Sequence, residues 1–119
     1  LTVPSPELIA VVGNLLKNAM EAVADLSGDQ RTVKLKILER SKYYIIQTQN
    51  HGWIPRELQS RIFESGFSTK TGSAERGIGL ASVKYQVEKY RGLVLISSHP
   101  LYGTRFTVCY PRGEREFSA

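Results

Sequence analysis

Apolar residues recur every three or four positions through the first quarter of the chain, a period that predicts one long amphipathic helix. At ~100° per residue, six of these positions fall within roughly 80° of one another: Leu8, Val12, Leu15, Ala19, Val23 and Leu26. Ser5 followed by Pro6 is typical of a helix start, with Ser5 as the N-terminal cap. The sequence Ser27-Gly28-Asp29 predicts that the helix ends at Leu26.

Alternation of apolar and polar residues replaces the helical period after this point. Residues 32–38 alternate valine, leucine and isoleucine with lysine, which predicts a half-buried strand. Three further strands are expected at 43–48, 93–98 and 104–110, with turns at 41–42 and at Gly103.

Two more helices and one loop complete the pattern. A short helix is expected from Pro55 to Glu64, and a longer one from Gly79 to Tyr90, ended by Gly92. The longer helix has Leu80, Val83, Val87 and Tyr90 on one side. Residues 67–76 are rich in Gly, Ser, Thr and Lys without periodicity, and they predict a loop.

This order of elements predicts an α+β fold, a two-layer α/β sandwich with helices on one face of a mostly antiparallel mixed sheet. The sequence contains no internal repeat and no interdomain linker. We therefore expect one domain over residues 1–111 and a polar C-terminal tail over 112–119.

Composition narrows the class of protein. The 119 residues carry a formal charge of +5 and a single cysteine, Cys109, which excludes an internal disulfide and a cysteine-based zinc cluster. No apolar run approaches the ~20 residues of a spanning helix, so a soluble domain in a reducing compartment is expected. The basic residues are dispersed, which favours small anionic ligands such as nucleotides over nucleic acid. A start at Leu1 without methionine suggests a piece of a longer protein.

The first helix also carries a polar stripe, about 110° from its apolar seam. The stripe consists of Asn14, Asn18, Glu21 and Asp25. It is either a polar flank that faces water or part of a hard-cation site, because an amide oxygen can complete the octahedron of a Mg²⁺ held by water and phosphate.

Glycines later in the chain favour the second interpretation. Arg76-Gly77-Ile78-Gly79-Leu80 stands where the predicted loop becomes a helix, and glycines there let the backbone approach a phosphate. The preceding Phe67-Ser68-Thr69-Lys70-Thr71-Gly72 adds hydroxyl groups and an ammonium. Together the two segments predict a lid over phosphate groups.

These motifs resemble the ATP-binding catalytic domain of sensor histidine kinases, in the superfamily shared with gyrase, heat-shock chaperones and mismatch-repair proteins. Four stretches carry the resemblance in order: 14–22, an asparagine box; 62–70, a phenylalanine box with the start of the lid; 77–80, a glycine box; and 103–106, a closing Gly-Thr-x-Phe strand. Their variants look most similar to sensors of the citrate and dicarboxylate type.

The resemblance implies a role for each matched residue. Asn18 would bind Mg²⁺ at the ATP phosphates, with support from Asn14. Lys17, Lys70 and Arg76 would neutralise phosphate charge, and Thr104 would line the adenine end. The other ATP-binding positions implied are Glu21, Gly52, Phe67, Ser68, Thr69, Gly77, Ile78, Gly79 and Leu80.

Two departures from the family pattern matter. Relatives that hydrolyse ATP have a glutamate at the position of Asn14, and an amide cannot act as that general base, so slow hydrolysis and kinase activity are expected.

The second departure concerns adenine recognition. The segment 47–55 lacks the aspartate that accepts the adenine amino group in the family. If one residue is missing before Ile54, Asn50 stands at the position of that aspartate. Without such a gap, Gln49 stands there. A neutral acceptor loses about 1–2 kcal/mol, roughly tenfold in affinity.

The resemblance also implies partners. Neither His51 nor His99 is followed by an acidic residue, so the phosphoacceptor histidine is expected on a separate helical dimerisation domain outside this chain. A response regulator would act downstream. The domain itself would lie in the cytoplasm, as the cytoplasmic portion of a membrane-anchored sensor, and would contact neither nucleic acid nor the membrane directly. The alternatives are a degenerate nucleotide-binding or regulatory module of the same fold, and an anti-sigma-factor serine kinase.

Overall fold

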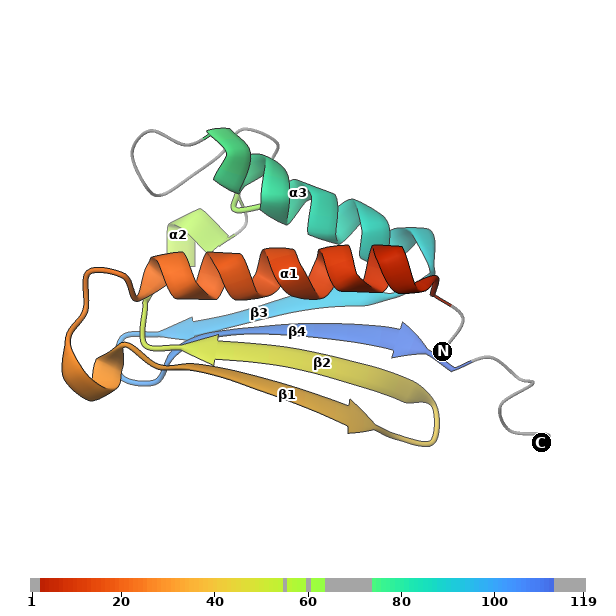
Figure 1. Cartoon of the computed structure of the whole chain (residues 1–119), viewed down its shortest axis with the longest axis horizontal. Helices are drawn as coiled ribbons and strands as arrows, with labels where there is room; N and C mark the ends of the chain where they lie inside the picture. Colours follow the sequence, from red (N-terminus) through yellow and green to blue (C-terminus); the bar gives the residue numbers. More distant parts are fainter. Residues whose placement is uncertain (1–2, 55, 60, 64–73, 113–119) are drawn as a thin grey trace.

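The computed structural model describes residues 3–54, 56–59, 61–63 and 74–112. They form two layers, with the helices on one face of a single sheet (Figure 1). In chain order the elements are α1 (Ser5–Ala22), a 3-10 turn η1 (Gly28–Gln30), β1 (Val33–Glu39), β2 (Tyr43–Asn50), α2 (Arg56–Gln59), α3 (Ala74–Lys89), β3 (Leu93–His99) and β4 (Gly103–Pro111).

The sheet has the strand order β1-β2-β4-β3, and each neighbouring pair is antiparallel. The two-layer sandwich is therefore confirmed, with a fully antiparallel described sheet rather than a mixed one. The predicted turn at 41–42 is also present, because the Arg40 amide donates to the Tyr43 carbonyl at 2.8 Å. Beside it, the Arg112 amide donates to the carbonyl of Lys42 at 2.9 Å.

The ends of α1 differ from those expected. The helix starts at Ser5, its N-cap residue is Pro4, and no side chain caps it, so the expectation of Ser5 as the cap is wrong. The helix ends at Ala22 rather than at Leu26. The Val23 and Ala24 amides donate to carbonyls only three residues earlier, which tightens and ends the last turn.

Helix α3 starts earlier than expected. It includes residues 74–78, which the sequence analysis assigned to a loop and its junction. Ala, Glu and Arg, the residue types at 74–76, are good helix formers. At the other end, Arg91 has the left-handed backbone (φ 64°), and the Gly92 amide closes the helix on the Val87 carbonyl.

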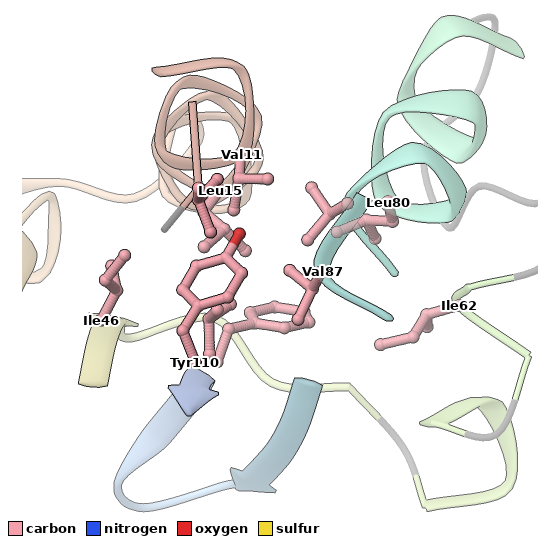
Figure 2. Close-up of a cluster of buried hydrophobic side chains, with 11 residues drawn as sticks. Val11, Leu15, Ile46, Ile62, Leu80, Val87 and Tyr110 are labelled. Carbon is pink, nitrogen blue, oxygen red and sulfur yellow. The ribbon is translucent and has the colours of Figure 1, made fainter. Parts of the chain in front are cut away.

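The core lies between the two helices and the central strands (Figure 2). Val11 and Leu15 of α1 and Leu80 and Val87 of α3 belong there to one buried cluster with Tyr110 of β4. Further buried members are Ile46, Ile62, Val83, Phe106 and Val108. The apolar side of α3 and that of the long helix up to Val23 are therefore confirmed as core, whereas Leu26 lies beyond the helix and outside the core cluster.

Strand β1 is less buried than expected. Leu35 and Ile37 are 44% and 65% exposed, although they share the helix-facing side of the sheet with Thr48 and Ile46 of β2. Edge position alone does not explain this, because β3 is the other edge strand; the core cluster packs on β2, β4 and β3 and includes no residue of β1. None of the helices in the described part of the chain is long and apolar enough to cross a membrane.

Candidate functional site

Several predicted site residues lie at one end of the sheet. Here β2 ends at Asn50, β4 begins at Gly103, α1 ends and α3 begins (Figure 1, left). Residues from four separate motifs are thus brought to the same end of the molecule.

Asn50 and Thr104 form the buried centre of this end. They are cross-strand partners, 3% and 2% exposed, on the helix-facing side of the sheet. The Asn50 Oδ1 accepts the backbone N–H of Gly52 at 2.7 Å. The Thr104 hydroxyl donates to the Gly52 carbonyl, also at 2.7 Å. Both polar groups of Gly52 are therefore held by side chains from two neighbouring strands.

Ser98 of β3 extends this arrangement. Its Oγ lies 2.7 Å from the Thr104 Oγ1 and accepts the Ile54 N–H at 2.8 Å. Because the Thr104 proton is used on Gly52, Ser98 must be the donor in the bond between the two hydroxyls. We call Asn50, Gly52, Ile54, Ser98 and Thr104 the strand-end network. It fixes the loop after β2 to three strands of the sheet.

Two glycines permit this close packing. Gly103 has φ +82°, and a Cβ built on it would lie 1.9 Å from the Asn50 carbonyl oxygen. A Cβ on Gly52 would lie 2.9 Å from the Asn50 Oδ1 and 3.2 Å from the Ala22 Cβ at the end of α1. Any side chain at either position would force the strand end, the loop or the helix end to shift.

Asn50 and Gln49, the two candidates for the position of the missing aspartate, face opposite sides of the sheet. Gln49 faces the opposite, helix-free side of the sheet. There its Nε2 donates to the Tyr102 carbonyl at 3.4 Å, and its Oε1 accepts from Arg105 at 3.3 Å. Only Asn50 lies on the side of the sheet that carries the helices.

The polar stripe of α1 faces α3. Glu7, on the same side of the helix, pairs with Lys89 at 3.1 Å and hydrogen-bonds Tyr90, both at the C-terminal end of α3. Asn14, Asn18 and Glu21 are half-buried along this side, and Lys17 is exposed. The side chains of Asn14 and Asn18 make no hydrogen bond to any residue that the structure describes.

The remaining predicted residues fall into two groups. Phe67, Ser68, Thr69 and Lys70 lie outside the described residues. Arg76, Gly77, Ile78 and Gly79 form the first turns of α3, so their backbone is helical and the expected loop-to-helix junction is not at this point. Leu80 is 8% exposed and belongs to the core, where its packing explains its apolar character.

The phenylalanine-box residues link the site to the core. Ile62 is buried at 3% exposure. The Phe63 ring meets the Phe106 ring edge-to-face at 6.1 Å, next to the Lys84 ammonium. The segment before residue 64 is thus fixed to β4 through Phe106, two residues beyond Thr104.

Ser98 is the residue that the sequence analysis missed. The signal was present, because alternation along 93–98 places Ser98 on the same side as Val94 and Ile96, both packed on the core. A hydroxyl in that position at a strand end needs a polar partner.

Among the described residues, no group of three or more His, Cys, Asp or Glu side chains is placed to hold a metal. A cation here would need oxygen ligands of another kind. The half-buried amides of Asn14 and Asn18 supply such oxygens without negative charge, which fits a Mg²⁺ whose other ligands are phosphates and water.

A two-layer sandwich with a polar helix stripe and a strand-end network agrees with the class that the sequence motifs suggested, an ATP-binding domain. The family model of the GHKL domain matches residues 5–102, and the chain belongs to this family. Membership implies ATP binding.

Named relatives agree with this assignment. The chain is 38% identical, over 91% of its length, to the sensor histidine kinase DcuS of Escherichia coli, and 33% identical over 90% to the sensor protein CitS of Halalkalibacterium halodurans. A solved structure of the mycobacterial sensor histidine kinase MprB superposes with a TM-score of 0.72 at 26% identity, covering 91% of this chain and 72% of that one. The chain spans about a fifth (20%) of the length of DcuS and CitS.

Proposed function

We propose that this chain is the catalytic domain of a two-component sensor histidine kinase. It would bind Mg-ATP between α1, the strand-end network and the start of α3, and donate the γ-phosphate to a histidine on a separate helical domain. A response regulator would then receive the phosphoryl group in the cytoplasm. The domain itself would contact neither nucleic acid nor the membrane, and its boundaries would be residues 1–111.

Each end of the nucleotide has candidate residues. Asn50, Gly52 and Thr104 would hold the base, next to the end of α1. Asn14, Lys17, Asn18 and Glu21, with Arg76 to Leu80 at the start of α3, would surround the triphosphate. Phe67, Ser68, Thr69 and Lys70 are proposed as the lid. Positioning and charge neutralisation are the chemistry required of a phosphoryl-transfer site, and these residue types supply both.

Magnesium would be held by the Asn18 amide oxygen, with phosphate and water as its other ligands, and when bound it would neutralise phosphate charge. Asn14 offers only an amide where a general base would be needed to activate water. The domain is therefore expected to hydrolyse ATP slowly and to keep it for transfer.

The observation that carries this proposal is the half-buried pair Asn14 and Asn18. These amides lie on the side of α1 that faces α3, in the half of the helix that leads to the end of the sheet where Asn50 and Thr104 lie. Their side chains bond to no other described residue. Half-buried amides that make no hydrogen bond to the described part of the chain have oxygen atoms available for a ligand.

Binding of a non-hydrolysable ATP analogue, measured by calorimetry with and without Mg²⁺, tests the assignment. Asn18→Ala should remove most of the Mg-dependent gain, at least about tenfold in Kd. Met20→Ala is the matched control, because Met20 is exposed on the opposite flank of the same helix, and it should bind as the unchanged chain does. An unchanged Mg-dependence in Asn18→Ala would show that the metal assignment is wrong.

Transfer to protein tests the kinase assignment. The chain, labelled ATP and a helical domain that carries a histidine followed by an acidic residue should yield an acid-labile phosphorylated product. Labelling of a protein serine instead would favour an anti-sigma-factor kinase of the same fold.

A second candidate function follows from one contact. The Asn50 Oδ1 is already bonded to Gly52, and residues 47–55 contain no carboxylate. A degenerate regulatory module that binds no nucleotide would be consistent with this. In that case ATP should not shift the melting temperature of the chain, and Asn50→Asp should restore a shift.

A further inference from the structure

We propose that the base end of this site presents an N–H donor instead of an acceptor, so that it takes 6-oxopurine nucleotides such as GTP and ITP at least as well as ATP. This inference rests on the proposed function, because it assumes that a nucleotide base lies against Asn50. It deepens that function by naming the class of base.

The orientation of the Asn50 amide is fixed by its partner. A backbone N–H can only donate, and the single acceptor of a carboxamide is its oxygen. The 2.7 Å contact with the Gly52 N–H therefore identifies the near atom as Oδ1. The NH₂ group occupies the other branch of the same planar amide, as a donor.

A flip of the amide is strongly opposed. It would set two donors against each other at Gly52, and it would leave a part-buried backbone N–H without its acceptor. The loop has little room to adjust, because even a Cβ on Gly52 would lie only 2.9 Å from the Asn50 Oδ1.

Hydroxyl protons do not replace this donor. Thr104 uses its proton on the Gly52 carbonyl, and Ser98 uses its own on the Thr104 Oγ1. Within the strand-end network, the Asn50 NH₂ is therefore the donor that remains for a ligand.

The purine bases differ at the atom concerned. Adenine has an amino group at position 6, a donor that would meet the donor NH₂ of Asn50. Guanine and hypoxanthine have a carbonyl oxygen at position 6, which would accept from it. An aspartate at position 50 would reverse the preference, because a carboxylate only accepts. Mismatched polar groups reject a ligand more strongly than a merely absent contact does.

The test is calorimetric titration of the chain with Mg-ATP, Mg-GTP and Mg-ITP. We expect GTP and ITP to bind at least as tightly as ATP, with ITP reporting position 6 alone because it lacks the 2-amino group. Asn50→Asp should move the preference toward ATP by about tenfold or more. Gln49→Glu makes the same amide-to-acid change one residue away, on the other face of the sheet, and should leave the preference unchanged.

Each outcome is informative. A tenfold preference of the unchanged chain for ATP over both other nucleotides overturns the inference and leaves the proposed function intact, and this result does not depend on whether any variant folds. Binding of ATP by Asn50→Asp alone overturns the inference in favour of the degenerate module. An unaltered preference for GTP and ITP in a folded Asn50→Asp overturns the role of Asn50. If neither protein binds any of the three nucleotides, the proposed function itself fails.

Discussion

Asn50 and Asn18 have the same side chain at the same end of the molecule, but the fold uses them differently. Asn50, at the strand end, is 3% exposed, and its oxygen is bonded to Gly52. Asn18, on the helix, is half-buried and bonds to no described residue. The comparison separates two parts of one site: a strand end where the fold already uses the amide oxygen, so that only the NH₂ group remains for a ligand, and a helix stripe whose whole amide remains for one.

This difference has an energetic meaning. Removing a partner from a buried network leaves the other group without a hydrogen bond, at a cost of about 1–3 kcal/mol. Removing an amide that bonds to no described residue, as at Asn18, should cost the fold almost nothing. Changes that remove a bond of the strand-end network should therefore lower stability, whatever they do to the ligand, whereas changes on the stripe should lower ligand affinity alone.

The largest loss of stability is expected for Gly103→Ala. The added Cβ would lie 1.9 Å from the Asn50 carbonyl oxygen, at a backbone φ of +82°. Strain and overpacking together should lower the free energy of unfolding by ~3 kcal/mol or more. Urea denaturation measures this loss. Gly28→Ala is the matched control, because Gly28 also has positive φ (+61°) but open space around it, and it should lose only ~1 kcal/mol. Equal losses at both glycines would show that the strand-end contact does not matter.

Alkaline pH should produce the next largest effect, at the end of β4 away from the site. Burial, followed by the charge of Glu7, raises the pKa of Tyr110 to about 12. The unfolded chain then loses this proton near pH 10 while the folded chain keeps it, so stability is complete below pH ~10 and falls as pH rises toward 12, by roughly 2–3 kcal/mol. Urea midpoints between pH 9 and 12 measure it.

Tyr110→Phe is the control for this titration, because it removes the ionising group and keeps the ring. It should flatten the alkaline fall without lowering nucleotide affinity. A slope that persists in Tyr110→Phe would assign the titration to another group.

Thr104→Val should have a moderate effect. The change keeps the shape of the side chain but removes the hydroxyl between Gly52 and Ser98, and it should cost about 1–2 kcal/mol of stability. Thr107→Val is the comparison, since its hydroxyl accepts only from Gln47 on the helix-free face, and it should cost less. A Thr104→Val protein as stable as the unchanged chain would remove the distinction between the two parts of the site.

The smallest change in stability is expected for Asn18→Ala. Alanine is the better helix former, and no described contact is lost, so the free energy of unfolding should stay within about 0.5 kcal/mol. Thermal melts without nucleotide provide the measurement. A loss above 1 kcal/mol would mean that Asn18 belongs to the fold, as Asn50 does.

Periodicity predicted most of the fold because it reports burial directly. The apolar seam of the first helix and the alternation in the central strands lead to the two-layer sandwich, since each pattern has one face to bury. Periodicity failed for β1, where the burial of a residue depends on whether the helices cover that strand. Leu35 and Ile37 have the pattern of a covered strand, but the core cluster packs on β2, β4 and β3 and leaves both side chains exposed.

The site was predictable in its motifs but not in its contacts. The spacing of Asn14 and Asn18 gives a shared helix side, whereas the choice between Asn50 and Gln49 depends on which residue faces the helices, and a one-residue shift reverses the answer. The role of Ser98 depends on its distance to Thr104, which lies beyond a turn and on a different strand. Short-range patterns contain no such distance.

The exposed edge strand has a consequence for handling the protein. Leu35 and Ile37 lie on β1 with one backbone edge unpaired in this sheet, an arrangement that invites a second copy to add its own strand. Lys34 and Lys36 alternate with them and place like charges on that edge, so two copies repel each other there. Since salt screens this repulsion, concentrated solutions of the chain should remain dispersed at low ionic strength and self-associate as salt is added.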